Sequence, residues 1–314
     1  MKLLEISVET DGEAAEAIHA LFNRYNRYGA VIEEEWPERP AVPVVRVKTF
    51  LPAEQSCALS QIEEALWHLG RLYPIPAPAV RWLEEADWAE VWKSSYKPLR
   101  IGQRIVIKPS WQSLAATPEQ IVIELDPGMA FGTGLHPSTR LILEALEHHI
   151  KPGDRVLDVG TGSGILAIAA ARMGAGNVLA LDVDGVALEV AHKNFTRNGV
   201  QERISLQRAS LTPGAMTEDS QQPVPALDAR GVWSGSFDLL LMNILADVIA
   251  HSAEAIAACL ADGGLAIVAG ILQAQEEHVR QALETAGLRI VKRHGKKDWV
   301  ALVARKETES REGA

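Results

Sequence analysis

Short apolar runs alternate with amphipathic helical stretches from about residue 121 onward. The runs have the length of strands, and a helix that joins two such strands crosses over to a parallel neighbour. The pattern therefore predicts an α/β fold with a mostly parallel sheet. The predicted strands are residues 155–159, 177–182, 204–207, 237–242 and 265–269, and the predicted helices are residues 164–173, 185–198 and 248–260.

The first part of the chain has a different pattern, with strand-like segments and two amphipathic helices in the order β-α-β-β-α-β. Gly29 ends the first helix, and a proline-rich run that begins at Pro74 ends the second. This order predicts a small ferredoxin-like α+β domain, which by itself indicates no particular chemistry. The predicted strands are residues 3–8, 30–35, 44–51 and 80–84, and the predicted helices are residues 13–28 and 54–72.

We expect two domains, because 314 residues are enough for two hydrophobic cores. The segment between them is rich in aromatic residues, which fits packing between the domains better than a docking surface for a partner. The predicted boundaries are residues 1–87 for the ferredoxin-like domain, 88–120 for a linker, 121–306 for the α/β domain and 307–314 for a disordered tail.

Residues 212–236 interrupt the α/β pattern with a stretch rich in Pro, Gly, Ser and Gln. A loop of this length without secondary structure is uncommon inside a compact domain. It is either a lid over the substrate or a surface insertion, and the insertion is the commoner behaviour of such loops.

The charge balance limits the partners that we expect. The chain has 41 acidic and 31 basic residues and a formal net charge of −10. Broad neutralisation of phosphates needs clustered Lys and Arg, so we expect no direct nucleic-acid binding, although a local basic patch is compatible with an acidic total.

The cysteines and the N-terminus favour a cytoplasmic protein without a metal site. Cys57 and Cys259 fit no metal-binding spacing, and we expect both to be buried reduced thiols. Glu5 stands where a signal peptide needs an apolar run, and no stretch approaches the ~18 apolar residues of a membrane span.

Residues 156–166 combine a strand, a glycine-rich turn and the start of a helix. Gly160, Gly162 and Gly164 let the backbone turn tightly and approach a ligand without a Cβ in the way. A similar turn serves NAD and FAD, but Ile165 stands where a dinucleotide motif needs glycine. The spacing therefore favours a site in which a nucleoside, rather than a pyrophosphate, lies against the turn.

The ends of two later strands carry side chains that suit such a site. Asp182 lies 22 residues beyond Gly160, where a carboxylate accepts hydrogen bonds from both ribose hydroxyls. Asp184 is a weaker alternative for this role. Asn243 ends a buried strand, and its side-chain oxygen is suited to accept a hydrogen bond from an attacking amine. The alternative for Asn243 is a turn or capping role.

The segment from Asp126 to Thr139 is rich in glycine and contains Phe131 and His136. We expect it to fold over the ligand, and we expect Thr139 to cap the helix that follows. An orienting or structural role is expected for His136.

Together these motifs resemble the bacterial ribosomal protein L11 methyltransferases, a family of class I S-adenosylmethionine-dependent methyltransferases. The loop pattern Gly-x-Gly-x-His-Pro with a following Thr is specific to this family, whereas the glycine turn alone is not. The resemblance covers nearly the whole chain, although residues 212–236 depart from the compact form of the family. It rests on residues 126–139, 158–164, 243–246 and 270–272, and on residues 92–93, 98, 102 and 109–111 of the linker.

The resemblance implies a seven-stranded Rossmann-like domain closed by a hairpin at residues 288–292 and 299–304, and a first domain that recognises the substrate protein. It implies S-adenosylmethionine as the cofactor and trimethylation of lysine side chains and of the N-terminal amino group of large-subunit ribosomal protein L11. The reaction is an in-line displacement at a sulfonium methyl, which needs a neutral, oriented amine but no metal. The residues expected at the cofactor are Phe131, Thr139, Gly160, Gly162, Asp182 and Asn243, and Asn243 is also the expected catalytic residue.

Two other functions stay open at this point. The first is methylation of another amine, in a different protein, an RNA base or a small molecule, and the acidic net charge weighs against RNA. The second is a non-catalytic cofactor-binding or ribosome-assembly module, against which the presence of both Asp182 and Asn243 weighs. We expect the chain to be a monomer.

Overall fold

The computed structural model describes residues 2–10, 12–25, 30–35, 44–52, 58–73, 75–84, 98–126, 134, 136–211 and 233–307. The chain divides into two compact units. One comprises Met1–Arg100, Val106–Thr117 and Glu124–His136, and the other comprises Ile101–Ile105, Pro118–Ile123 and Pro137–Ala314.

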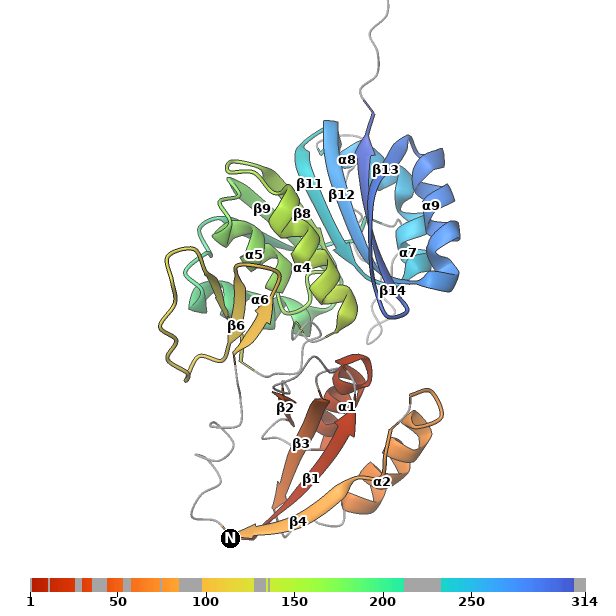
Figure 1. Cartoon of the computed structure of the whole chain (residues 1–314). Coiled ribbons are helices and arrows are strands. Elements are labelled where there is room, and N and C mark those ends of the chain that lie inside the picture. Colours follow the sequence, from red (N-terminus) through yellow and green to blue (C-terminus); the bar gives the residue numbers. More distant parts are fainter. Residues whose placement is uncertain are drawn as a thin grey trace, which may run out of the picture. The chain divides into compact units, whose positions relative to one another are not determined.

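The N-terminal strands form a four-stranded antiparallel sheet in the order β2-β3-β1-β4 (Figure 1). Along α1, Ile18 and Phe22 are four positions apart, share one face and are fully buried. The strand order confirms the ferredoxin-like arrangement. Its elements are β1 (Lys2–Thr10), α1 (Gly12–Tyr25), β2 (Ala30–Glu35), β3 (Val44–Pro52), α2 (Ala58–Leu69) and β4 (Ala79–Glu84).

Part of the predicted linker has regular structure. β5 (Leu99–Ile101), β6 (Ile105–Lys108) and β7 (Ile121–Glu124) form a three-stranded sheet in that order. Lys108 Nζ lies 2.6 Å from Glu124 Oε1 and joins β6 to β7. The aromatic residues of the linker at positions 88, 92 and 96 lie outside the described residues.

The second unit contains a seven-stranded sheet in the order β10-β9-β8-β11-β12-β14-β13. The strands from β8 to β12 pair in parallel, and β14 runs antiparallel to both β12 and β13. This confirms the predicted sheet and its closing hairpin. The strands are β8 (Arg155–Val159), β9 (Asn177–Asp182), β10 (Ile204–Arg208), β11 (Phe237–Asn243), β12 (Leu260–Leu272), β13 (Leu288–Lys296) and β14 (Trp299–Lys306).

Helices cover this sheet; one predicted helix needs correction, and one helix of the structure was not predicted. The predicted helix at residues 248–260 is two helices that meet at Ser252, and the helix α9 was not predicted at all. The helices are α4 (Pro137–His149), α5 (Ile165–Arg172), α6 (Gly185–Arg197), α7 (Ala246–His251), α8 (Ala253–Cys259) and α9 (Glu276–Thr285).

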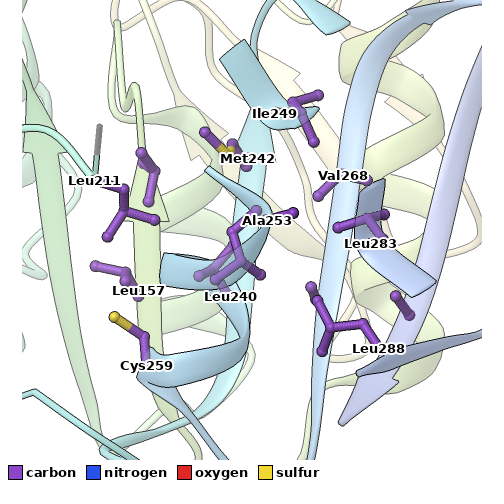
Figure 2. Packing of buried hydrophobic residues seen from close by; sticks show 14 of the residues in the cluster. Leu157, Leu211, Leu240, Met242, Ile249, Ala253, Cys259, Val268, Leu283 and Leu288 are labelled. Atoms are coloured by element: carbon purple, nitrogen blue, oxygen red, sulfur yellow. The ribbon is translucent and has the colours of Figure 1, made fainter. Parts of the chain in front are cut away.

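One hydrophobic core joins α7, α8 and α9 to a face of the sheet, as Figure 2 shows. Leu240 and Met242 of β11 point into it beside Val268 of β12, and Ile249 and Leu283 enter it from the helices. Alternate residues of a strand face opposite sides, so the neighbouring Leu239 and Leu241 are buried on the other face of the sheet.

Cys259 lies in this core as a free thiol, as predicted, and burial raises its pKa to about 11. Cys57 lies outside the described residues. Among the residues that the structure describes, no helix is long and apolar enough to cross a membrane. Nor does any group of three or more His, Cys, Asp or Glu in this part of the chain come together as it would to hold a metal ion.

Candidate active site

The turn after β8 is built on glycines with positive φ. Gly160, Gly162 and Gly164 have φ values of 70°, 55° and 83°. A Cβ at Gly160 would lie 2.6 Å from Cγ2 of Ile244, and a Cβ at Gly164 would collide with the ring of Phe195. The glycines are therefore needed for backbone conformation and for close packing, in addition to the approach to a ligand that the sequence suggested.

A buried acid at the end of β8 anchors this turn. The Oδ2 of Asp158 accepts hydrogen bonds from Thr161 Oγ1 at 2.6 Å and from the amide of Ala167 at 3.2 Å. Its Oδ1 is buried without a hydrogen-bond partner among the described residues. The pKa of Asp158 is raised to about 7, chiefly by burial and to a smaller extent by the neighbouring Asp182, while the hydrogen bonds from Thr161 and Ala167 oppose the rise.

Sequence reasoning assigned no role to Asp158. The available signal was an acidic residue inside an otherwise apolar buried strand, Val-Leu-Asp-Val. Such a residue is costly to bury unless it is neutral or hydrogen-bonded.

Asp182 ends β9 beside the turn and is hydrogen-bonded to it. Its Oδ2 accepts from the amide of Gly162 at 2.8 Å, and its Oδ1 accepts from the amide of Asp184 at 3.0 Å. Each carboxylate oxygen has a second lone pair, so both can still accept from ribose hydroxyls. The weaker alternative, Asp184, instead caps α6 by accepting from the amide of Val186 at 2.9 Å.

Asn243 ends β11, two strands away from β9 at the same carboxyl edge of the sheet. Its Nδ2 donates a hydrogen bond to Oγ1 of Thr139 at 3.2 Å. Because the amide nitrogen is used in this way, the side-chain oxygen is the atom that is left to accept from an amine. The structure thus brings together two predicted residues that are 104 positions apart.

The predicted capping role of Thr139 is wrong. α4 begins at Pro137, so Thr139 is already the third residue of the helix. Proline is favoured at the first helical position because its missing N–H needs no partner there. Thr139 is 1% exposed, and its hydroxyl accepts the hydrogen bond that orients Asn243 instead of capping the helix.

Little of the loop before α4 belongs to the described part of the chain. Asp126 accepts hydrogen bonds from the amide of Ser110 at 2.7 Å and from its hydroxyl at 3.0 Å. Gly134 has a φ of 88°, and His136 is buried. Phe131 lies outside the described residues, so its predicted contact with the cofactor stays a prediction.

The groups at this edge suit a nucleoside: a glycine turn, an acid at the end of the next strand and an uncharged acceptor two strands away from that acid. Together with the seven-stranded sheet and its reversed hairpin, it defines a class I S-adenosylmethionine-dependent methyltransferase. The family model of Ribosomal protein L11 methyltransferase (PrmA) matches residues 2–307, and the chain belongs to this family.

Known relatives are similar over almost their whole length. The chain is 43% identical to the ribosomal protein L11 methyltransferase of Chloroflexus aurantiacus, over 96% of this chain and 98% of that protein. It is 42% identical to the ribosomal protein L11 methyltransferase of Pelotomaculum thermopropionicum, over 97% of this chain and 99% of that protein. A crystal structure of ribosomal protein L11 methylase from Lactobacillus delbrueckii subsp. bulgaricus is 31% identical, with a TM-score of 0.57, and covers 68% of this chain and 100% of that chain.

Proposed function

We propose that this enzyme methylates ribosomal protein L11 of the large subunit, at lysine side chains and at the N-terminal amino group, up to the trimethyl state. This proposal is supported by the family match over residues 2–307. It is also supported by relatives that are named ribosomal protein L11 methyltransferase and whose length this chain covers almost completely. We also propose that the enzyme acts in the cytoplasm, as a monomer, on free or assembling L11, because its proposed substrate is a ribosomal protein.

The cofactor supplies a methyl group bound to a positively charged sulfur. We propose that Asp182 holds the ribose hydroxyls, while Gly160 and Gly162 let the cofactor lie against the turn. Thr139 and Phe131 complete the contacts. This assignment uses the observed placement of Asp182 within hydrogen-bond distance of the turn itself.

The catalytic role that we assign to Asn243 is orientation of the amine. An amine that attacks carbon must present its lone pair in line with the bond that breaks, and it must be neutral. The side-chain oxygen of Asn243 accepts a hydrogen bond from an N–H of the substrate amine, so the lone pair of the amine nitrogen points away from Asn243. The hydrogen bond to Thr139 is the observation that carries this proposal, because it fixes which end of the carboxamide faces the amine.

We propose the following division of labour along the chain. Residues 1–87 recognise the substrate protein, residues 88–120 connect the domains and residues 121–306 bind the cofactor, followed by a tail at residues 307–314. The ferredoxin-like sheet order supports the first assignment only as a fold that can present a binding surface.

The test of this site separates binding from chemistry. Asn243→Ala should lower kcat on L11 by about 100-fold, the usual cost of losing alignment, with cofactor Kd changed little. Asp182→Ala should instead weaken cofactor binding about tenfold or more, because it removes charge-assisted hydrogen bonds. Calorimetry with the cofactor and steady-state assays on L11 measure the two effects.

Thr139 offers a matched pair of controls. Thr139→Ser keeps the hydroxyl that accepts from Asn243 and should keep turnover, whereas Thr139→Val removes it and should lower kcat. If Asn243→Ala left turnover intact, or if Thr139→Val behaved like Thr139→Ser, the role given to Asn243 would be wrong.

A further inference from the structure

The exposed large apolar side chains of the second unit lie at one edge of its sheet. In the described part of this unit they are Val186, Leu245 and Leu272, which are 45%, 74% and 36% exposed. Val186 lies in the first turn of α6 after β9, Leu245 directly precedes α7 after β11, and Leu272 ends β12. Because the strands from β9 to β12 pair in parallel, these side chains share the carboxyl edge that carries Asp182 and Asn243.

Leu245 is the most exposed of the three, and it occupies a position that leucine does not favour. Its carbonyl accepts hydrogen bonds from the amides of Val248 at 3.0 Å and Ile249 at 3.1 Å, so it is the N-cap of α7. The side chain makes no capping hydrogen bond, whereas Ser, Thr, Asp or Asn at this position would stabilise the helix. Single exposed leucines are common, but neither packing nor capping explains a leucine here.

The strand order separates the two sides of Asn243. The order is β9-β8-β11-β12, so the glycine turn after β8 and Asp182 at the end of β9 lie on one side. β12 lies on the other side and extends to Leu272, beyond the residue Ala269 that pairs with Asn243. The lone pair of an attacking amine must point at the cofactor methyl. The chain attached to the amine therefore extends away from the cofactor, toward the β12 side.

Leu245 lies next to Asn243 in the chain but is not needed to pack the glycine turn. The residue between them, Ile244, fills that space, because a Cβ at Gly160 would lie 2.6 Å from its Cγ2. α7 begins directly after Leu245 and packs against β12 and α9. The side chain of Leu245 is thus open to solvent close to Asn243, at the start of a helix on the β12 side of the site.

The two kinds of amine in the proposed substrate differ in the group that carries them. A lysine amine stands at the end of an aliphatic stem, and such stems pack along apolar surfaces while the polar head stays outside. The N-terminal α-amine is attached directly to the backbone and has no stem. An exposed leucine beside the amine acceptor therefore favours lysine.

We propose that Leu245 contacts the aliphatic stem of the substrate lysine while Asn243 holds its amine. The inference rests on the proposed function and adds to it a residue that determines the preference between lysine ε-amines and the N-terminal α-amine. Each methylene group that the contact withdraws from water strengthens binding by about fourfold.

The experiment uses the full-length enzyme and purified L11. Peptide mass spectrometry measures kcat/KM at lysines and at the N-terminal amine of the same substrate protein, so that docking and cofactor binding affect both alike. We expect Leu245→Ser to lower kcat/KM at lysines by about fourfold or more, with kcat/KM at the N-terminal amine unchanged. Leu245→Met keeps an apolar side chain and should retain lysine methylation. The matched control is Val186→Ser, which removes an exposed apolar side chain on the cofactor side and should leave lysine methylation unchanged.

Thermal unfolding separates this role from a structural one. Serine is a better N-cap than leucine, so Leu245→Ser should keep or raise the Tm while it lowers kcat/KM at lysines. If Leu245 served the fold, the same substitution would lower the Tm.

The outcomes distinguish this inference from the proposed function on which it rests. Unchanged lysine methylation with Leu245→Ser, an equal fall at both kinds of amine, or an equal fall with Val186→Ser would each overturn the role of Leu245 and leave the proposed function standing. No methylation of L11 lysines by the wild type would overturn the proposed function at lysine, and this inference with it.

Discussion

The buried carboxyl of Asp158 joins the end of β8 to the first turn of α5 through Thr161 and Ala167. Its pKa is about 7 in the folded protein, compared with an ordinary value of 3.8, so it keeps its proton up to about pH 7 when the chain is folded. Between these two pH values the folded chain binds one proton more than the unfolded chain. The stability that Asp158 contributes is therefore greatest below about pH 4 and decreases as the pH rises from about 4 to about 7. Above about pH 7 this contribution no longer changes with pH.

The neutral variant Asp158→Asn tests this linkage. Relative to this variant, the wild type should lose stability on the order of 4 kcal/mol between pH 4 and pH 7, at ~1.4 kcal/mol per pKa unit. Urea unfolding at a series of pH values measures the difference. Asp262→Asn, at an exposed position, is the control and should show no such trend. A wild-type-minus-variant difference that stays constant with pH would show that Asp158 is ionised throughout.

At the level of secondary-structure elements, the close approach of β11 and β12 at the active-site edge depends on a glycine of β12. Gly270 has a φ of 88°, and a Cβ there would collide with the carbonyl oxygen of Ile244. Ile244 follows Asn243 directly, and its amide donates to the carbonyl of Ala269 at 3.2 Å. The position of Asn243 therefore depends on the absence of a side chain at Gly270.

Gly270→Ala and Gly263→Ala form a matched pair of substitutions. Both glycines have positive φ, but a Cβ at Gly263 meets nothing within 4 Å. Gly263→Ala should cost only the ~1–2 kcal/mol of a left-handed conformation. Gly270→Ala should cost clearly more and should also lower kcat, because β11 must move. Thermal unfolding and turnover measure both effects, and equal losses in the two variants would refute the packing argument.

Local patterns were sufficient to predict most elements of the fold. The bounds of β8 and β9 follow from apolar runs that end at a glycine turn and at an acid, and both match the structure. α9 was missed because it is mostly polar and only Val279 and Leu283 are fully buried. The break at Ser252 was missed because alanine-rich helices on either side continue the same periodicity.

The site was less predictable than the fold, because its contacts join distant segments. Asp182 and the glycine turn are close in sequence, and their pairing followed from known strand-turn chemistry. The Thr139–Asn243 hydrogen bond depends on how α4 packs against β11, which no local pattern contains.

Considered as one chain, the protein joins a ferredoxin-like sheet to a methyltransferase sheet, and the family match spans both. This continuity supports a single substrate class for the whole chain, since both parts are shared with relatives that carry the same name over nearly their full length. The central claim is therefore one about the substrate.

Mass spectrometry of purified ribosomal protein L11 after incubation with this enzyme and S-adenosylmethionine tests that claim most directly. We predict mass gains in multiples of one methyl group, mapped by peptide fragmentation to lysines and to the N-terminal amine, and strongly reduced with Asn243→Ala. No gain on L11, with cofactor binding intact by calorimetry, would leave the methyltransferase class standing and would contradict L11 as the substrate.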